Sequence, residues 1–151
     1  MMSRRAPRLT LGLAAAVTAS ALVLALRAPA AETGNPVRVG RTCHSDLAPE
    51  YPISCGTYGF GDLRHACSRP LSQASDCPLT KALTVRNTGE AAVYVALTSG
   101  PRQGVRIDGR ERLLPPGASC TLRPAKGGQL FDVTLRRAGK GPGVLRVTAV
   151  E

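Results

Sequence analysis

Beyond residue 79, apolar and polar residues alternate in short segments, and Gly, Pro and Asn residues separate one segment from the next. An alternating segment places its apolar side chains on one face of a β-strand, whereas a helix needs a spacing of three and four residues. No window in this half of the chain has the helical spacing. The alternating segments are residues 81–86, 91–97, 105–107, 111–114, 119–123, 130–136 and 144–150. Such short strands, each with one apolar face, predict an all-β antiparallel sandwich.

The alternation also predicts which side chains form the core. They are Leu83, Val85, Val93, Val95, Leu97, Cys120, Leu122, Phe131, Val133, Leu135, Leu145, Val147 and Ala149. Residues 87–90, Asn-Thr-Gly-Glu, predict a tight turn, because Asn and Gly both tolerate a positive φ angle. A second turn is expected at residues 115–117, Pro-Pro-Gly.

The first thirty residues have the pattern of a signal peptide. Three arginines precede an uncharged run over residues 9–26, and Ala-Pro-Ala at 28–30 offers small residues for cleavage. This pattern predicts export of residues 31 onward, as a secreted or cell-surface protein. An uncleaved membrane anchor is the alternative, because the run approaches the length that spans a bilayer. The arginine pair at residues 4–5 leaves a twin-arginine export route open beside the general one.

Net charge narrows the range of expected partners. Without residues 1–30 the chain keeps 16 basic and 10 acidic residues, a net charge of +6, which favours contact with anionic partners. Nucleic-acid-binding proteins add stacking aromatics or a dense basic stripe. Here the basic residues are scattered and the chain has only five aromatic residues. We therefore expect a protein or an anionic cell-wall component as partner, no nucleic acid, and a membrane only if the N-terminal segment is retained.

The cysteines are expected to form disulfides, because exported proteins meet an oxidising environment. They are Cys43, Cys55, Cys67, Cys77 and Cys120. Since five thiols leave one unpaired, the simplest arrangement places two bridges within residues 43–77 and leaves Cys120 free. An alternative joins Cys120 to one of the other four and frees another for an intermolecular bond.

Turn-forming residues dominate residues 43–78, and aliphatic side chains there are few. Disulfides, or packing on a neighbouring element, are expected to order this segment, which can add a strand or a covering loop to the sandwich. Residues 31–42 have the composition of an unstructured polar leader. The predicted organisation is therefore a signal peptide (1–30), a polar leader and cysteine-rich segment (31–78) and a β-sandwich (79–151).

Two motifs in the C-terminal half resemble those of Hydin-type immunoglobulin-like domains. Residues 83–89, Leu-Thr-Val-Arg-Asn-Thr-Gly, are similar to the strand and N-x-G turn that open such a domain. Residues 114–122, Leu-Pro-Pro-Gly-Ala-Ser-Cys-Thr-Leu, are similar to its L-x-P-G-x-S-C-T turn and strand. The resemblance covers residues 79–150. It implies an immunoglobulin-like sandwich that serves as an adhesive, spacer or interaction module of a secreted bacterial protein, without catalytic residues.

The sequence carries no recognisable catalytic motif. His44 and His65 are candidate bases, with Asp46 or Asp62 to orient them and a cysteine as nucleophile. Their spacing does not support that arrangement, and the chain lacks both G-x-S-x-G and H-E-x-x-H. We therefore expect a protein that is not an enzyme and that carries no cofactor.

A metal site is a weaker hypothesis. Cys43, His44, His65 and Cys67 would supply thiolates and imidazoles, which suit zinc or copper. The chain has no C-x-x-C, and cysteines in disulfides are not ligands. No metal site is predicted.

Two loops are candidates for recognition. Residues 56–61 carry Thr57, Tyr58 and Phe60, although aromatics in so lean a segment more often pack inward. Residues 138–143 carry Lys140. The sequence thus predicts an exported, non-enzymatic cell-surface or secreted interaction or adhesion module. The alternative is a secreted inhibitor with a disulfide-braced loop, or a small-ligand or metal-binding protein.

Overall fold

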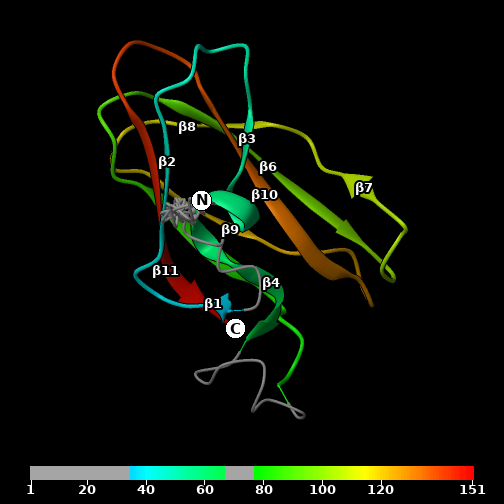
Figure 1. Ribbon diagram of the computed structural model, residues 1–151. Helices are drawn as coiled ribbons and strands as arrows, with labels where there is room; N and C mark the ends of the chain where they lie inside the picture. Colours follow the sequence, from blue (N-terminus) through cyan, green and yellow to red (C-terminus); the bar gives the residue numbers. More distant parts are fainter. Residues whose placement is uncertain (1–34, 67–76) are drawn as a thin grey trace, which may run out of the picture.

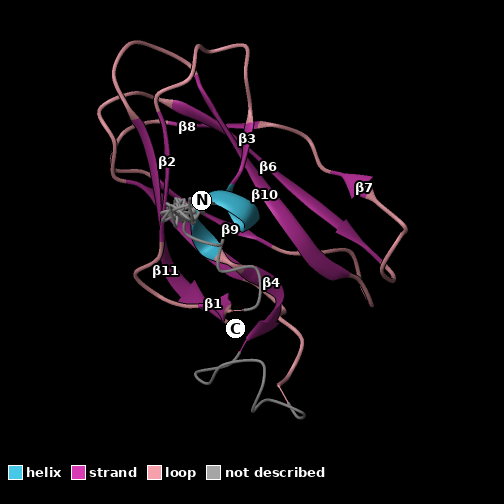
Figure 2. Ribbon diagram, in the orientation of Figure 1, coloured by secondary structure: helices cyan, strands magenta, loops and turns pink. Residues whose placement is uncertain are grey.

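The computed structural model describes residues 35–66 and 77–151, so the predicted signal peptide lies outside it (Figure 1). Strands and loops form most of these described residues, with one short helical turn among them (Figure 2). The strands are β1 (Pro36–Val37), β2 (Thr42–Ser45), β3 (Ile53–Ser54), β4 (Asp62–Ala66), β5 (Leu83–Asn87), β6 (Val93–Gly100), β7 (Ile107–Asp108), β8 (Arg112–Leu114), β9 (Ser119–Leu122), β10 (Gln129–Arg137) and β11 (Gly143–Val150). The helical turn is η1 (Gly56–Phe60). No helix within the described residues is long and apolar enough to cross a membrane.

Two antiparallel sheets pack face to face, and the predicted all-β sandwich is confirmed. One sheet has the order β2-β11-β5-β9. The other has the order β3-β10-β6, and both β7 and β8 pair with β6. The consecutive strands β10 and β11 lie in opposite sheets. A short parallel pair, β1 and β4, lies beside the sandwich near the C-terminus (Figure 1).

The core follows from the alternation of side chains along the strands. Leu83 and Val85 of β5, Val93 and Val95 of β6, and Leu145 of β11 are fully buried. At about 25 cal/mol per Å² of buried apolar surface, such side chains supply the main force that holds the sheets together. The other fully buried large side chains are Val37, Phe60, Leu63, Leu130, Val133, Leu135 and Val147.

Bulges correct two of the predicted core positions. The register of β10 against β6 shifts between Leu130 and Asp132, so that Leu130 is fully buried and Phe131 is only half-buried. The register of β11 against β5 shifts between Val147 and Ala149, which leaves Ala149 half-buried. A bulge adds one residue to one strand, and so it reverses the inward and outward assignment beyond it.

Residues 42–54, from the predicted leader and cysteine-rich segment, are part of the sandwich. Strand β2 pairs with β11, and β3 pairs with β10, so the segment adds an edge strand to each sheet. The predicted polar leader is ordered at its end, because Val37 is 1% exposed and the Gly40 N–H donates to the Val147 carbonyl oxygen. Apolar surface that is buried in this way offsets the entropy lost on ordering a polar segment.

The turn after β5 forms for a different reason from the one predicted. Neither Asn87 nor Gly89 has a positive φ. Instead, the buried Asn87 side chain donates to the carbonyl oxygens of Ala91 (2.8 Å) and Leu114 (2.9 Å) and accepts the N–H of Gly89 (3.0 Å). A Cβ atom at Gly89 would meet the Pro142 carbonyl oxygen at 2.6 Å, so glycine is needed there for close packing.

Candidate interaction site

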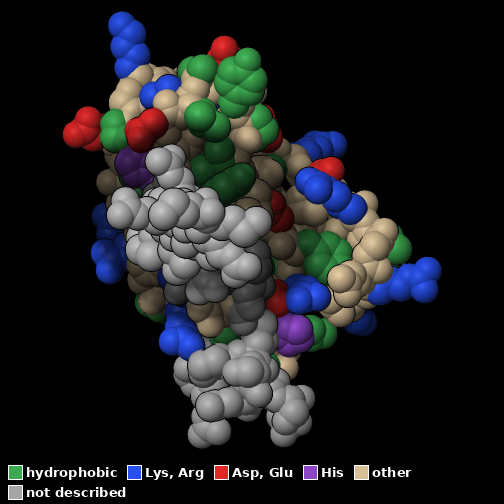
Figure 3. All heavy atoms as spheres, in the orientation of Figure 1, with side chains coloured by type: hydrophobic (Ala, Val, Ile, Leu, Met, Phe, Trp, Pro, Cys, Tyr) green, Lys and Arg blue, Asp and Glu red, His purple; other side chains and the backbone are tan. Residues whose placement is uncertain are grey.

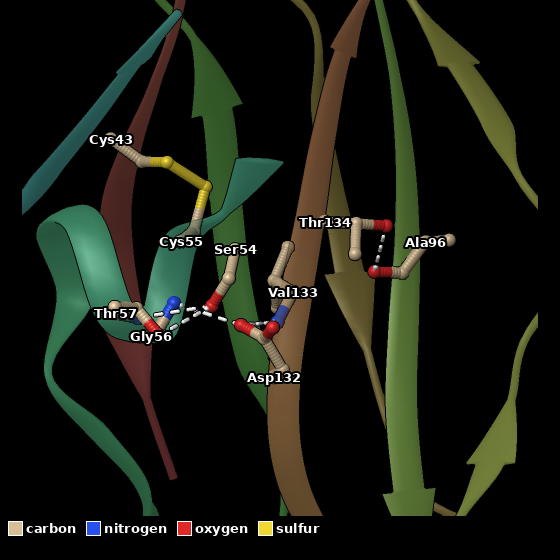
Figure 4. Close-up of a disulfide and its surroundings, with 9 residues drawn as sticks. All are labelled: Cys43, Ser54, Cys55, Gly56, Thr57, Ala96, Asp132, Val133 and Thr134. Carbon is tan, nitrogen blue, oxygen red and sulfur yellow. Dashed lines mark hydrogen bonds between the residues drawn. A yellow bond between two sulfur atoms is a disulfide. The ribbon is translucent and has the colours of Figure 1, made fainter. Parts of the chain in front are cut away.

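A disulfide joins the two sheets along one side of the sandwich. Cys43 lies in β2 and Cys55 directly follows β3, and their Cα atoms are 5.3 Å apart (Figure 4). Both side chains are fully buried. Because β2 and β3 are edge strands of opposite sheets, the bond fixes the separation of the sheets at this side. It also indicates an oxidising, extracytoplasmic environment.

The remaining cysteines have different states. Cys77 is disulfide-bonded, and Cys67 lies outside the described residues. Cys120 is a free thiol, 8% exposed, on β9. Burial raises the pKa of Cys120, and this outweighs the opposing effect of the nearby Arg112 guanidinium. The thiol is therefore protonated and unreactive at neutral pH.

The disulfide braces a loop at one end of the sandwich, residues 46–52, which we call the 46–52 loop. All seven of its residues are exposed. Leu47 is 49% exposed and Tyr51 is 60% exposed. Pro49 and Pro52 restrict the backbone, and the Tyr51 N–H donates to the Ala48 carbonyl oxygen within the loop (3.0 Å). The loop therefore presents two large apolar side chains on a restrained backbone.

Two successive arginines at the end of β10 hold this loop in place. Arg137 donates through Nε to the Leu47 carbonyl oxygen (2.6 Å) and through Nη1 to the Gly141 carbonyl oxygen (2.7 Å). Arg136 donates through Nη1 to the Pro49 carbonyl oxygen (3.2 Å). Arg137 thus links the 46–52 loop to the 138–142 loop, and both lie at the same end of the molecule (Figure 1).

Arg136 is itself fixed from two other sides. Its Nη2 and Nε atoms bind the Glu111 carboxylate at 2.6 and 3.0 Å. Its guanidinium lies 4.3 Å from the centre of the Tyr94 ring, a cation–π contact. The hydrogen bond from Arg136 lowers the pKa of Glu111, so the pair stays charged at neutral pH.

The predicted recognition loop at residues 56–61 has a mainly structural role. Phe60 is fully buried and unavailable for binding, which corrects its assignment as a contact residue. The Gly56 N–H donates to Asp132 Oδ1 (2.8 Å), and Ser54 Oγ bonds Thr57 Oγ1 (2.9 Å) (Figure 4). Tyr58, by contrast, is 71% exposed. Lys140, in the other predicted loop, is also exposed.

A small polar cleft of about 240 Å³ lies between η1, β4 and β10. Arg64 and Asp62, both on its wall, form a two-pronged ion pair with a shortest distance of 2.6 Å. Burial acts to raise the pKa of Asp62, but the hydrogen bonds from Arg64 outweigh it and lower this pKa. The charges of Arg64 and Asp62 thus neutralise each other.

Of the candidate catalytic and metal-binding residues, the structure describes Cys43, His44, Asp46, Asp62 and His65, whereas Cys67 lies outside the described residues. His44 Nε2 lies 2.9 Å from Asp46 Oδ1, but both side chains are more than half exposed. The neighbouring Cys43 is held in the disulfide and offers no thiolate. Across residues 35–66 and 77–151, no three His, Cys, Asp or Glu side chains are placed to hold a metal ion.

The 46–52 loop was not among the recognition loops predicted from the sequence. Its signal in the sequence was a short segment that contains Leu47, Tyr51 and two prolines and is flanked by Cys43 and Cys55. No local sequence pattern indicated that Arg136 and Arg137 would anchor the loop. Their partners, Pro49 and Leu47, lie 87 and 90 positions away along the chain.

Comparison with protein-family models, with curated proteins and with solved structures gives no significant match for this chain.

Proposed function

We propose that this chain is an exported, non-enzymatic interaction module that binds a protein partner through the 46–52 loop. The observation that carries the proposal is the exposure of Leu47 and Tyr51 on a backbone held by the disulfide, by Arg136 and by Arg137. Tyr is among the residues that dominate binding energy at protein interfaces. A loop fixed before binding loses little entropy when the complex forms.

The class of the sandwich is proposed to be immunoglobulin-like. Its support is the pair of motifs at residues 83–89 and 114–122, which form β5 with its turn and β9 with its preceding turn. In immunoglobulin domains the last two strands share a sheet, whereas β10 and β11 lie in opposite sheets. The proposal therefore rests on the motifs and not on the final strand connection.

The test is site-specific cross-linking in the exporting cell. A photoreactive phenylalanine analogue replaces Tyr51, and a matched variant carries it at Tyr58, which is at least as exposed. We expect a discrete protein adduct from position 51 that is absent from position 58. The variant Leu47→Ser with Tyr51→Ser should lower the affinity for the protein identified in that adduct by about tenfold or more.

Equal adducts from both positions, or unchanged affinity in the double variant, would contradict this use of the loop. Conversion of any substrate by the purified protein would contradict the non-enzymatic assignment. Both experiments require that the variants unfold at the same temperature as the wild-type protein, which is expected because the substituted side chains lie outside the core.

The braced loop also favours a second candidate, a secreted protease inhibitor. The carbonyl oxygens of Leu47 and Pro49 are fixed by arginines on both sides of Ala48, which gives the backbone of the loop one conformation. An inhibitor should block a co-exported protease at a one-to-one ratio. An adhesion module should instead bind its partner without affecting any proteolytic activity.

A further inference from the structure

After β6, the chain forms a projecting hairpin. It lies at the end of the β6–β10 pair that is opposite the 46–52 loop. We call residues 101–110 the arm. Every residue from 101 to 113 is exposed. Strand β7 pairs with β6 through Thr98 with Asp108 and Ser99 with Ile107, and the Gly109 N–H donates to the Leu97 carbonyl oxygen (2.7 Å). Figure 1 shows β7 as an edge strand of its sheet, at the outer side of the molecule.

The arm exposes two apolar side chains that do not pack in the core of the sandwich. Val105 is 37% exposed and Ile107 is 53% exposed. Ile107 begins β7 and Val105 stands two residues before it, so the two-residue period of a strand places both on one side of the arm. The other side carries Arg106, which pairs with Asp108 at 2.8 Å, and Asp108 also accepts a hydrogen bond from Thr98. One face is therefore apolar and the other is polar.

The charge of the arm is positive and comes entirely from arginine. It contains Arg102, Arg106 and Arg110 against a single carboxylate, Asp108. Among the described residues, Arg102 and Arg110 form no ion pair. In Figure 3, basic side chains project beside hydrophobic ones where the arm leaves the body of the molecule. Arginine is suited to phosphate groups, because its planar guanidinium binds two oxygens at once.

We propose that the arm docks on an anionic phospholipid bilayer, with Val105 and Ile107 inserted among the headgroups and Arg102 and Arg110 bound to lipid phosphates. Apolar side chains flanked by basic ones are the pattern of a membrane-surface contact. A soluble polyanion would attract the arginines but would gain nothing from Val105 and Ile107. The apolar face therefore favours the lipid.

This orientation leaves the protein-binding loop free. The arm follows Gly100, which pairs with Gln129, and the loop is anchored at Arg137, which pairs with Val93. The length of β10 between these pairs is about 27 Å. A molecule that rests on a bilayer through its arm would thus hold the 46–52 loop away from the lipid surface.

The test is sedimentation of the purified, natively exported protein with vesicles of phosphatidylcholine, with and without phosphatidylglycerol. We expect binding to the vesicles that contain phosphatidylglycerol and little to pure phosphatidylcholine. The variant Arg102→Gln with Arg110→Gln should bind about 25-fold more weakly. The variant Val105→Ser with Ile107→Ser should bind at least about tenfold more weakly.

Matched controls separate the arm from general charge and hydrophobicity. Arg38→Gln with Arg146→Gln removes the same charge from other exposed positions, and Val39→Ser removes an exposed apolar side chain. Each should change binding by less than about threefold, because surface charges act within about 10 Å at ordinary ionic strength.

Three results would overturn the proposal. Equal binding to both vesicle types, unaffected by the arm variants, would point to an uncleaved N-terminal segment. Loss in the arginine variant without loss in the Val105 and Ile107 variant would point to simple charge attraction. Absence of binding to either vesicle type by the folded wild-type protein would exclude a membrane contact.

Discussion

The Asn87 side-chain amide donates a hydrogen bond to the Leu114 carbonyl oxygen, 2.9 Å away and in the opposite sheet. Asn87 is fully buried, and its second amide hydrogen bonds the Ala91 carbonyl oxygen. Replacement by Ala would leave both carbonyl oxygens without these donors. We expect Asn87→Ala to lower the free energy of unfolding by about 2–4 kcal/mol, measured by urea denaturation. The exposed Thr88→Ala should change it by less than about 0.5 kcal/mol, and equal effects would refute this role.

The disulfide between Cys43 and Cys55 closes a separation of 12 residues. Closing a loop of this size removes unfolded-state entropy worth about 3 kcal/mol. The variant Cys43→Ala with Cys55→Ala should therefore lose about that much stability in urea denaturation. Cys120→Ala, which removes a thiol outside any disulfide, should lose about 1 kcal/mol. If the double variant lost no more than this control, the bridge would not brace the fold.

Arg137 is expected to control the mobility of the 46–52 loop. Arg137→Gln removes the donors to the Leu47 and Gly141 carbonyl oxygens, so the loop should open more often. We expect the Tyr51 amide, which is bonded to Ala48, to exchange its hydrogen about tenfold faster, as NMR can measure. Arg86→Gln removes a similar bond, from Arg86 Nε to the Gly117 carbonyl oxygen, and should leave Tyr51 exchange unchanged. Similar exchange in both variants would show that Arg137 is not the anchor.

Asp62 is expected to contribute to acid sensitivity. Its pKa is lower in the folded state than the ordinary value of 3.8, through the hydrogen bonds from Arg64. Between the folded and unfolded pKa values the unfolded chain binds more protons, so stability falls as the pH falls. We expect Asp62→Asn to be less stable than wild type at pH 7 and to lose less stability between pH 5 and pH 3. Parallel stability curves for the two proteins would contradict a lowered pKa.

Cys120 should be unreactive in the folded protein. Burial raises its pKa and shields the sulfur atom. We expect iodoacetamide to leave the folded protein unmodified and to alkylate one cysteine per chain after unreduced protein is unfolded, as mass spectrometry will show. Rapid alkylation under native conditions would mean that the edge beside β9 opens readily.

The sequence could predict those features of the fold that depend on neighbouring residues. The alternation along residues 83–85 and 93–95 determines which side chains face inward, because every strand has the same two-residue period. The bulge before Asp132 depends on the fit between β10 and β6, and so Phe131 was wrongly assigned to the core. The role of Asn87 is likewise tertiary, since its acceptor Leu114 lies 27 residues away.

The candidate site was harder to predict than the fold. Composition made residues 56–61 a candidate for recognition but favoured inward packing of their aromatics, and Phe60 fills the core while Gly59 lies against the Thr42 backbone. Tyr51 is exposed because the 46–52 loop extends beyond the ends of β2 and β3. The positions of these two strands depend on their pairing with β11 and β10, which lie far along the chain.

The position of the disulfide has a consequence for resistance to proteolysis. Cys43 and Cys55 lie on either side of the exposed loop between β2 and β3. A protease that cuts one peptide bond within residues 46–52 would add one water molecule to the mass but release no fragment. The N-terminal piece would stay attached through the disulfide and through the pairing of β2 with β11. Damage at this loop would therefore be confined to the loop, and the rest of the sandwich would persist as a nicked but intact body.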